Sequence, residues 1–270
     1  MTAGDGAPIA MELRGVHKAF RGKPVLQGID LAIREGETFT ILGGSGSGKS
    51  VCLKHMIGLL KPDSGSVSVF GTEISGLSED ALIDVRRSLA MVFQSAALFD
   101  SLSVYENVAY PLREHRDWPE AQIAERVASC LEAVGLPRSQ ALLPAELSGG
   151  MRKRVGVARA IALEPRAILY DEPTTGLDPA NQKRIGELIV ALQRRLRITS
   201  VVVTHELALC FEISNRVALL KNGRIAAVGS ADEIQASQQP DVVAFLSGSR
   251  DAIAELQDAP PEQRRSPDGP

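Results

Sequence analysis

Residues 43–50 match the pattern G-x-x-x-x-G-K-[ST] at every fixed position. The apolar stretch 38–42 before them predicts a buried strand, and the residues from about 48 to 60 predict a helix. A glycine-rich loop between a strand and a helix can point several backbone N–H groups at a phosphate chain. This feature therefore predicts an α/β fold that holds a nucleotide on the following residues: Gly43, Gly44, Ser45, Gly46, Ser47, Gly48, Lys49 and Ser50.

A second apolar strand, predicted over residues 167–171, ends in the carboxylates Asp171 and Glu172. Combined with the loop, the pattern assigns Lys49 to the β- and γ-phosphates, and Ser50 and Asp171 to Mg²⁺. Glu172 would polarise the attacking water. An acidic pair after a strand is more often a solvated loop, so this interpretation depends on the phosphate loop. Without ligand we expect Lys49 to face solvent.

Residues 147–151, Leu-Ser-Gly-Gly-Met, resemble the signature motif of the ATP-binding cassette (ABC) family, which usually ends in Gln where this chain has Met151. Other family motifs occur in the correct order over residues 11–230. The resemblance assigns Phe20 to stacking on adenine, Gln94 to the Q-loop and Mg²⁺, Ser148, Gly149 and Gly150 to the γ-phosphate, Asp178 to the D-loop and His205 to the switch histidine.

The resemblance implies a P-loop NTPase (RecA-like) core with an antiparallel β subdomain and an inserted α-helical subdomain, the ABC ATPase type. The cassette would cover residues 11–247, with the helical subdomain at about 95–165. Residues 1–10 are expected to be flexible, and the Pro-rich tail 248–270 partly disordered. ATP and Mg²⁺ are the implied cofactors, and Glu172, His205 and Lys49 the implied catalytic residues.

The family resemblance also implies a head-to-tail homodimer, in which each ATP lies between Lys49 of one subunit and Ser148 and Gly150 of the other. A separate integral-membrane permease would dock near Gln94 and the helical subdomain. Residues 93–100, 107–115, 149–151 and 158–165 further resemble the ATPases of Mla systems, and the segment 94–115 distinguishes these from importers of amino acids or metals. Those systems move phospholipids between the inner and outer membranes of Gram-negative bacteria, with a permease, an MCE-domain lipid-binding protein and a STAS-domain regulator.

The expected function is therefore an ATPase subunit driving phospholipid transport, bound peripherally to the cytoplasmic face of the bacterial inner membrane. An ATPase of an importer for another substrate, such as a polar amino acid, is the alternative. A non-transport ABC protein of DNA repair or translation is a more remote one, because such proteins carry long coiled coils or tandem cassettes.

Composition excludes several other classes. The net charge of −3 argues against a nucleic-acid partner, which would favour a basic chain. No apolar run approaches the roughly 18 residues that a membrane span needs, and the N-terminus lacks the pattern of a secretory signal. The three cysteines are far apart and form no C-x-x-C pair, so we expect buried, reduced thiols.

Overall fold

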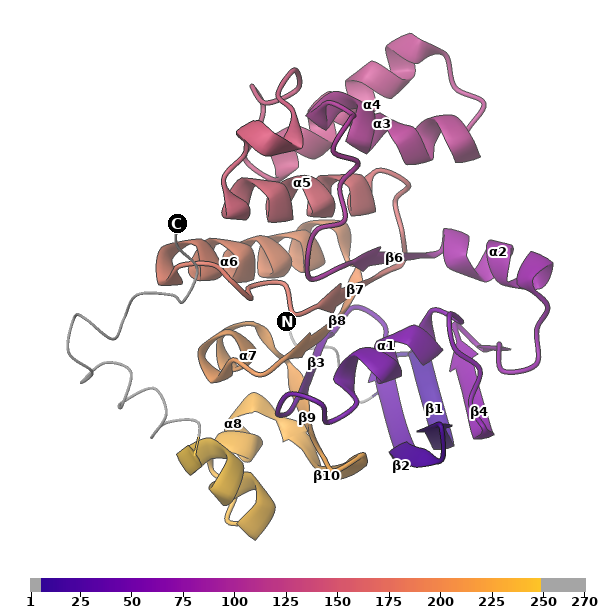
Figure 1. The fold of residues 1–270 in the computed structure, drawn as a ribbon, viewed down its shortest axis with the longest axis vertical. Helices are drawn as coiled ribbons and strands as arrows, with labels where there is room; N and C mark the ends of the chain where they lie inside the picture. Colours follow the sequence, from indigo (N-terminus) through magenta and orange to yellow (C-terminus); the bar gives the residue numbers. More distant parts are fainter. Residues whose placement is uncertain (1–5, 249–270) are drawn as a thin grey trace.

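A six-stranded, mostly parallel sheet forms the centre of the protein, whose computed structural model describes residues 6–248 (Figure 1). Its inner strands are almost wholly buried and read as continuous apolar runs, as expected for a parallel sheet covered on both faces. Among the described strands of this sheet, only β10, the last in the chain, is antiparallel to its neighbour. The order is β10 (Arg224–Ser230), β9 (Arg216–Lys221), β3 (Thr38–Leu42), β8 (Thr199–Thr204), β7 (Ala167–Asp171) and β6 (Leu89–Val92).

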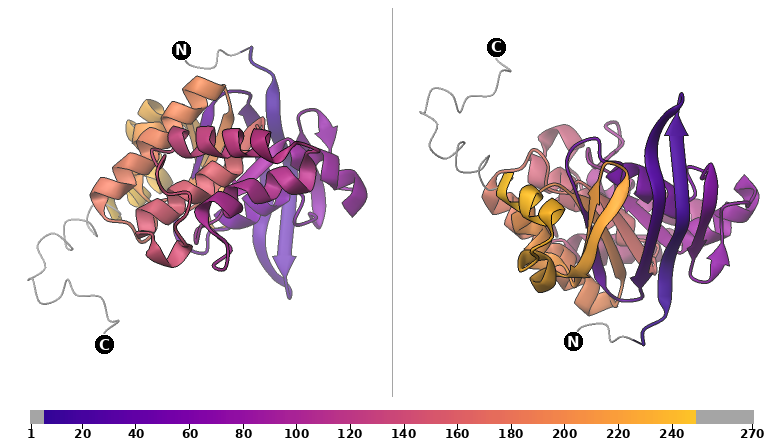
Figure 2. Two further views of the ribbon diagram at one scale, coloured as in Figure 1. Left: turned by 90° about the horizontal axis from the view of Figure 1, so that it is seen from above. Right: turned by 90° about the horizontal axis from the view of Figure 1, so that it is seen from below.

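A second, antiparallel sheet of four strands packs against α1 (Lys49–Met56), and its long strands form one flank of the molecule (Figure 2). Its order is β2 (Lys23–Arg34), β1 (Ile9–Phe20), β4 (Ser64–Val69) and β5 (Thr72–Glu73). β1 begins two residues before the predicted start of the cassette, and its second residue, Ala10, is fully buried. Positions 9–10 are therefore part of the sheet and not of a flexible terminus.

Between β6 and β7 the chain leaves the sheet and builds a helical subdomain, at the top of Figure 1. Its members are α3 (Val104–His115), α4 (Glu120–Ala133), the 3₁₀ turn η1 (Pro144–Glu146) and α5 (Gly149–Ile161). Ser103 and Glu106 form a capping box at the start of α3. The apolar faces of α3, α4 and α5 share one core, and this core continues onto strands β7 and β8 of the central sheet.

The remaining helices cover the sheet. They are α2 (Glu79–Arg87), α6 (Pro179–Leu196), α7 (Leu207–Ile213) and α8 (Ala231–Gln235), and residues 240–248 are also helical. Position 248, the first of the predicted tail, still belongs to that helix, and the rest of the tail lies outside the described residues. Cys52, Cys130 and Cys210 are buried and unpaired, as predicted. Among residues 6–248, no helix combines the length and apolar character that a membrane crossing requires.

Candidate active site

The phosphate loop connects β3 to α1, and two of its glycines are required by close approaches. A Cβ atom on Gly43 would lie 2.5 Å from the carbonyl oxygen of Leu220. Gly48, the residue that caps α1, has φ 108°, and a Cβ there would lie 2.8 Å from a methyl carbon of Leu26. Larger side chains would therefore push the loop away from the sheet. The sequence motif reflects this packing as well as phosphate chemistry.

Lys49 is buried, not solvent-facing as predicted, with 6% of its surface exposed. Its Nζ donates to the carbonyl oxygens of Gly43 and Gly44 at 2.8 and 3.1 Å. The same Nζ lies 3.1 Å from Oε1 of Glu172. The loop also contains a buried hydroxyl, Ser47 Oγ, with no hydrogen-bond partner among the described residues. A phosphate oxygen would satisfy both this hydroxyl and the lysine.

The carboxylates at the end of β7 meet the start of α1, as the sequence predicts. Ser50 Oγ donates to Oδ1 of Asp171 at 2.7 Å. Glu172 follows directly, in the left-handed region with φ 46°, a conformation that non-glycine residues adopt only where their surroundings hold them. Nδ1 of His205, at the end of β8, lies 2.9 Å from Oε2 of Glu172. The fold therefore gathers Lys49, Ser50, Asp171, Glu172 and His205.

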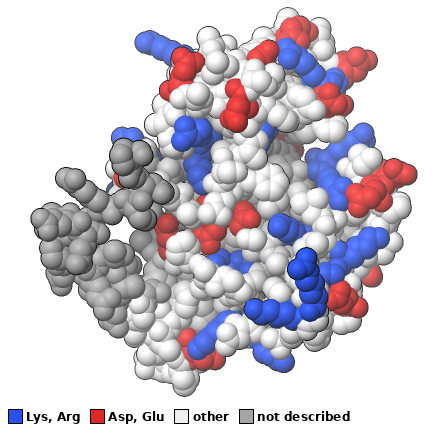
Figure 3. Space-filling model, viewed as in Figure 1, with Lys and Arg blue, Asp and Glu red and all other residues white. Residues whose placement is uncertain are grey.

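The oxygen atoms of Ser50 and Asp171 fit a magnesium ion. Mg²⁺ prefers oxygen ligands and is commonly held by one or two protein groups together with substrate phosphates. Within residues 6–248, no group of three or more His, Cys, Asp or Glu side chains could hold a metal alone. Figure 3 shows Asp and Glu side chains near the middle of this face, below the helical subdomain. This donor set suits a metal that arrives with a nucleotide.

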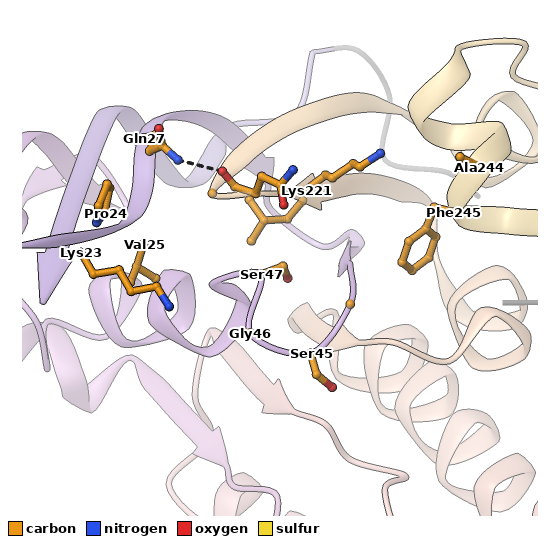
Figure 4. Close-up of a pocket in the computed structure, with 14 residues that line it drawn as sticks. Lys23, Pro24, Val25, Gln27, Ser45, Gly46, Ser47, Lys221, Ala244 and Phe245 are labelled. Atoms are coloured by element: carbon orange, nitrogen blue, oxygen red, sulfur yellow. Dashed lines mark hydrogen bonds between the residues drawn. The ribbon is translucent and has the colours of Figure 1, made fainter. Parts of the chain in front are cut away.

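A cavity of about 660 Å³ opens beside the phosphate loop, within the range of small-molecule sites. Figure 4 shows Ser45, Gly46 and Ser47 on one side and Lys23 and Val25 of β2 nearby. Phe20 lies at the end of β1 and pairs in register with Lys23. Phe20 is 42% exposed, and the ammonium of Lys18 lies 5.8 Å from the centroid of its ring. An exposed aromatic ring of this kind suits stacking on a base.

The predicted signature residues lie elsewhere in the subunit. Ser148 caps α5 by accepting a hydrogen bond from the amide of Met151 at 3.3 Å. A Cβ on Gly150 would lie 2.8 Å from Oδ1 of Asn181, the residue that Asp178 caps at the start of α6. In the described part of the chain, no hydrogen bond or ion pair joins these groups to Lys49 or Glu172. The assignment of the signature residues to the γ-phosphate stays a prediction.

Gln94 lies in the loop after β6, and its side chain is exposed. Its carbonyl accepts a hydrogen bond from Lys153 on α5, but no hydrogen bond links its amide group to Ser50 or Asp171. The assignment of Gln94 to Mg²⁺ stays a prediction. Gly149 and Gln94 line a smaller cavity of about 200 Å³ together with residues that follow β7.

Sequence reasoning missed Lys153, which is buried next to Glu172. A basic residue in a stretch rich in arginine suggests a solvated helix face. The signal was helical spacing, because residue 153 shares a face with the buried residues Gly150 and Val157.

The sequence profile of the ABC transporter family matches residues 26–175 of this chain. The chain belongs to the ABC transporter family. It is 41% identical over 232 residues to the intermembrane phospholipid transport system ATP-binding protein MlaF of Haemophilus influenzae, which covers 86% of this chain and 88% of that protein. It is 38% identical over 242 residues to the probable ribonucleotide transport ATP-binding protein mkl of Mycobacterium leprae. That match covers 90% of this chain and 70% of that protein.

A third relative is the methionine import ATP-binding protein MetN of Carboxydothermus hydrogenoformans, 42% identical over 225 residues, with 82% of this chain and 66% of that protein covered. Among solved structures, the ABC ATPase fold is shared with the dimeric cassette MJ0796 bound to ADP and phosphate. The TM-score is 0.76 at 33% identity, over 82% of this chain and 98% of that one. The chain is therefore an ABC-type ATPase that binds nucleotide.

Proposed function

We propose that this ABC ATPase drives phospholipid transport between the inner and outer membranes of a Gram-negative bacterium. The observation that supports this substrate is the match to the MlaF protein, which extends over nearly nine-tenths of both chains. MetN is similar in identity, but this chain spans only 66% of its length. Methionine or another amino acid is therefore the second candidate substrate.

The contacts of Glu172 suggest how ATP would be hydrolysed. When ATP binds, Lys49 would move from Glu172 to the β- and γ-phosphates, because the phosphates carry more negative charge than one carboxylate. Glu172 would then accept a proton from the attacking water, while His205 holds Oε2 of its carboxylate. Ser50 and Asp171 would bind Mg²⁺, which would offset charge that develops on the phosphates.

A homodimer is supported by the dimeric form of the similar cassette MJ0796, and by the lack of a direct hydrogen bond between the signature loop and Lys49 within the described subunit. In this arrangement Ser148, Gly149 and Gly150 of one subunit would contact the γ-phosphate bound by the other. The hydroxyl of Ser148 and the N-terminus of α5 supply donors suited to an anion. Asp178, at the start of α6, would line the same interface.

An exposed pair of aromatic rings marks the surface that would bind the permease. Phe99 and Tyr110 are 44% and 43% exposed, and their ring centroids are 5.0 Å apart. Phe99 follows Gln94 by five positions, and Tyr110 lies on α3. Both belong to the part of the helical subdomain to which the permease is predicted to dock. Aromatic residues are enriched in protein interfaces, where they supply much of the binding energy. The permease would hold the ATPase on the cytoplasmic face of the inner membrane, with an MCE-domain protein and a STAS-domain regulator as further partners.

The catalytic assignment is tested by Glu172→Gln in the purified chain. The amide keeps the shape of the side chain but cannot act as a base, so hydrolysis should fall by about two to four orders of magnitude. ATP affinity should stay within about three-fold, and the mass measured by size-exclusion chromatography with light scattering should double in Mg-ATP. Glu125→Gln, on the exposed face of α4, is the control. A normal rate in Glu172→Gln would refute the assignment of the base.

The substrate is tested separately, in a reconstituted complex of this chain with its membrane permease. We expect ATP hydrolysis by the reconstituted complex to increase when the MCE-domain protein and phospholipid vesicles are supplied. Stimulation by a free amino acid and a soluble binding protein, without a response to phospholipid, would favour the second candidate.

A further inference from the structure

Lys153 joins three segments of the candidate site through one buried ammonium group. It lies on α5, five positions after Ser148, and is 6% exposed. Its Nζ donates to the carbonyl oxygen of Gln94 and to that of Glu172, the latter at 3.4 Å. Burial lowers the pKa of Lys153, while the neighbouring carboxylates of Glu172, Glu206 and Asp171 act in the opposite direction. A lysine with such surroundings holds backbone in place and does not interact with solvent.

The loop that contains Gln94 is fixed to α5 at further points. Ala96 and Ala97 have φ values of 63° and 46°, in the left-handed region. Arg159 of α5 donates to their carbonyl oxygens at 2.9 and 2.8 Å. A Cβ on Gly156 would lie 3.2 Å from that of Ala96, so the helix and the loop are in close contact. A shift of the loop after β6 must therefore carry α5 with it.

Lys153 extends this connection to the candidate base. Glu172 has φ 46°, and its carbonyl group and its side chain belong to one strained residue. The backbone can hold such a conformation only where other groups fix it. The ammonium of Lys153 fixes the carbonyl, whereas Lys49 and His205 hold the carboxylate. Moving Lys153 would consequently change the direction in which the carboxylate points.

The junction has room for such a change. A cavity of about 200 Å³ is lined by Lys153, Gln94, Gly149 and the residues after Glu172, among them Thr175 and Gly176. This cavity opens to solvent, so the segments that line it can shift without repacking a close-packed interior.

We propose that Lys153 is a positioning residue that couples the two ATP sites of the homodimer. It connects Glu172, which would act on the ATP of its own subunit, to the helix whose first turn would contact the ATP of the partner subunit. The inference rests on the proposed function of Glu172 and Ser148. Occupancy of one site then changes the signature loop at the other, and hydrolysis becomes cooperative in ATP.

Lys153→Met tests this proposal in the purified full-length chain. The methionine fills similar space but donates no hydrogen bond, so we expect kcat to fall about ten-fold or more. The Hill coefficient for ATP should fall from above one in the wild type toward one. The Kd of a fluorescent ATP analogue should stay within about three-fold, because Lys153 does not contact the phosphate loop. Lys153→Arg keeps a charged donor and should restore most of kcat and of the Hill coefficient.

Arg154→Met is the matched control on the same helix. Arg154 also donates to two backbone carbonyls, those of Val134 and Gly135, but inside the helical subdomain. We expect its loss to lower the melting temperature and to leave kcat and the Hill coefficient within about two-fold of the wild type. Equal losses in Arg154→Met and Lys153→Met would show general loosening of α5 and overturn the proposal.

Other outcomes are also decisive. A wild-type Hill coefficient of one, or unchanged kinetics in Lys153→Met, would overturn the coupling. If Lys153→Met does not fold, Lys153→Gln is used instead, because its shorter amide cannot bridge both carbonyls and the same kinetic losses are expected. Loss of hydrolysis in Glu172→Gln with unchanged Lys153 variants would refute this inference alone. Normal hydrolysis in Glu172→Gln would refute the catalytic site itself.

Discussion

The ion pair between Lys49 and Glu172 should be a strong, measurable coupling in the nucleotide-free protein. Its atoms are 3.1 Å apart, and the two side chains are 6% and 12% exposed. With an effective dielectric constant of about 20, Coulomb's law gives roughly 5 kcal/mol of attraction at this distance, which desolvation offsets in part. We therefore expect a coupling free energy of about 2–4 kcal/mol.

A double-mutant cycle with Lys49→Met and Glu172→Gln measures this coupling in urea unfolding without nucleotide. Each single change leaves a buried charge without its partner and should cost about 3 kcal/mol. The double mutant removes both charges and should lose far less than the sum of the two. The exposed pair Lys221–Asp241, at 2.8 Å with 40% and 60% exposure, is the control and should couple by less than about 1 kcal/mol. Additivity within about 0.5 kcal/mol at Lys49 and Glu172 would refute the reasoning.

Two further predictions concern the surface and acid stability. Tyr110→Asp should weaken co-purification with the permease by about ten-fold or more, because it removes one ring of the exposed pair. The control is Ile83→Asp on α2, where Ile83 is similarly exposed, and this change should leave co-purification with the permease unaffected. Hydrogen bonds from Lys18 and from the amide of Ala19 lower the pKa of Asp63. The resulting stability is complete above the unfolded pKa of about 4 and is lost as pH falls through the lower folded pKa. Asp63→Asn should make the melting temperature depend less steeply on pH below about pH 4. A slope equal to that of the wild type would contradict this prediction.

Local sequence patterns were sufficient to predict those features that depend on one helix or strand and the residues next to it. The strands over residues 38–42 and 167–171 were predicted at both ends, because each is a short apolar run that ends at polar or glycine residues. The contact between Ser50 and Asp171 was also predictable, since a phosphate loop and an acidic strand end meet at one edge of a parallel sheet. α2 and β6 were missed, because α2 buries only Leu82 and β6 is four residues long.

The partners of the buried lysines could not be predicted, because they depend on tertiary contacts. Lys49 pairs with a carboxylate that lies 123 positions later in the chain, and Lys153 donates to carbonyls on two different loops. Backbone carbonyls give no sequence signal, since every residue has one. The position of Gln94 likewise depends on how the loop after β6 packs on α5.

The two buried lysines contact different groups of Glu172, one its carboxylate and the other its backbone carbonyl. Lys49 pairs with the carboxylate, and the same ammonium is the group that would bind the phosphates. In the proposed cycle, the base is thus neutralised until ATP arrives, and the arrival of ATP frees it. Lys153 holds the carbonyl of the same residue and would not be displaced by ATP, because it contacts α5 and the loop of Gln94 instead of the phosphate loop. Freeing the carboxylate would therefore depend on a subunit's own nucleotide, whereas its direction would depend on the helix that faces the partner's nucleotide.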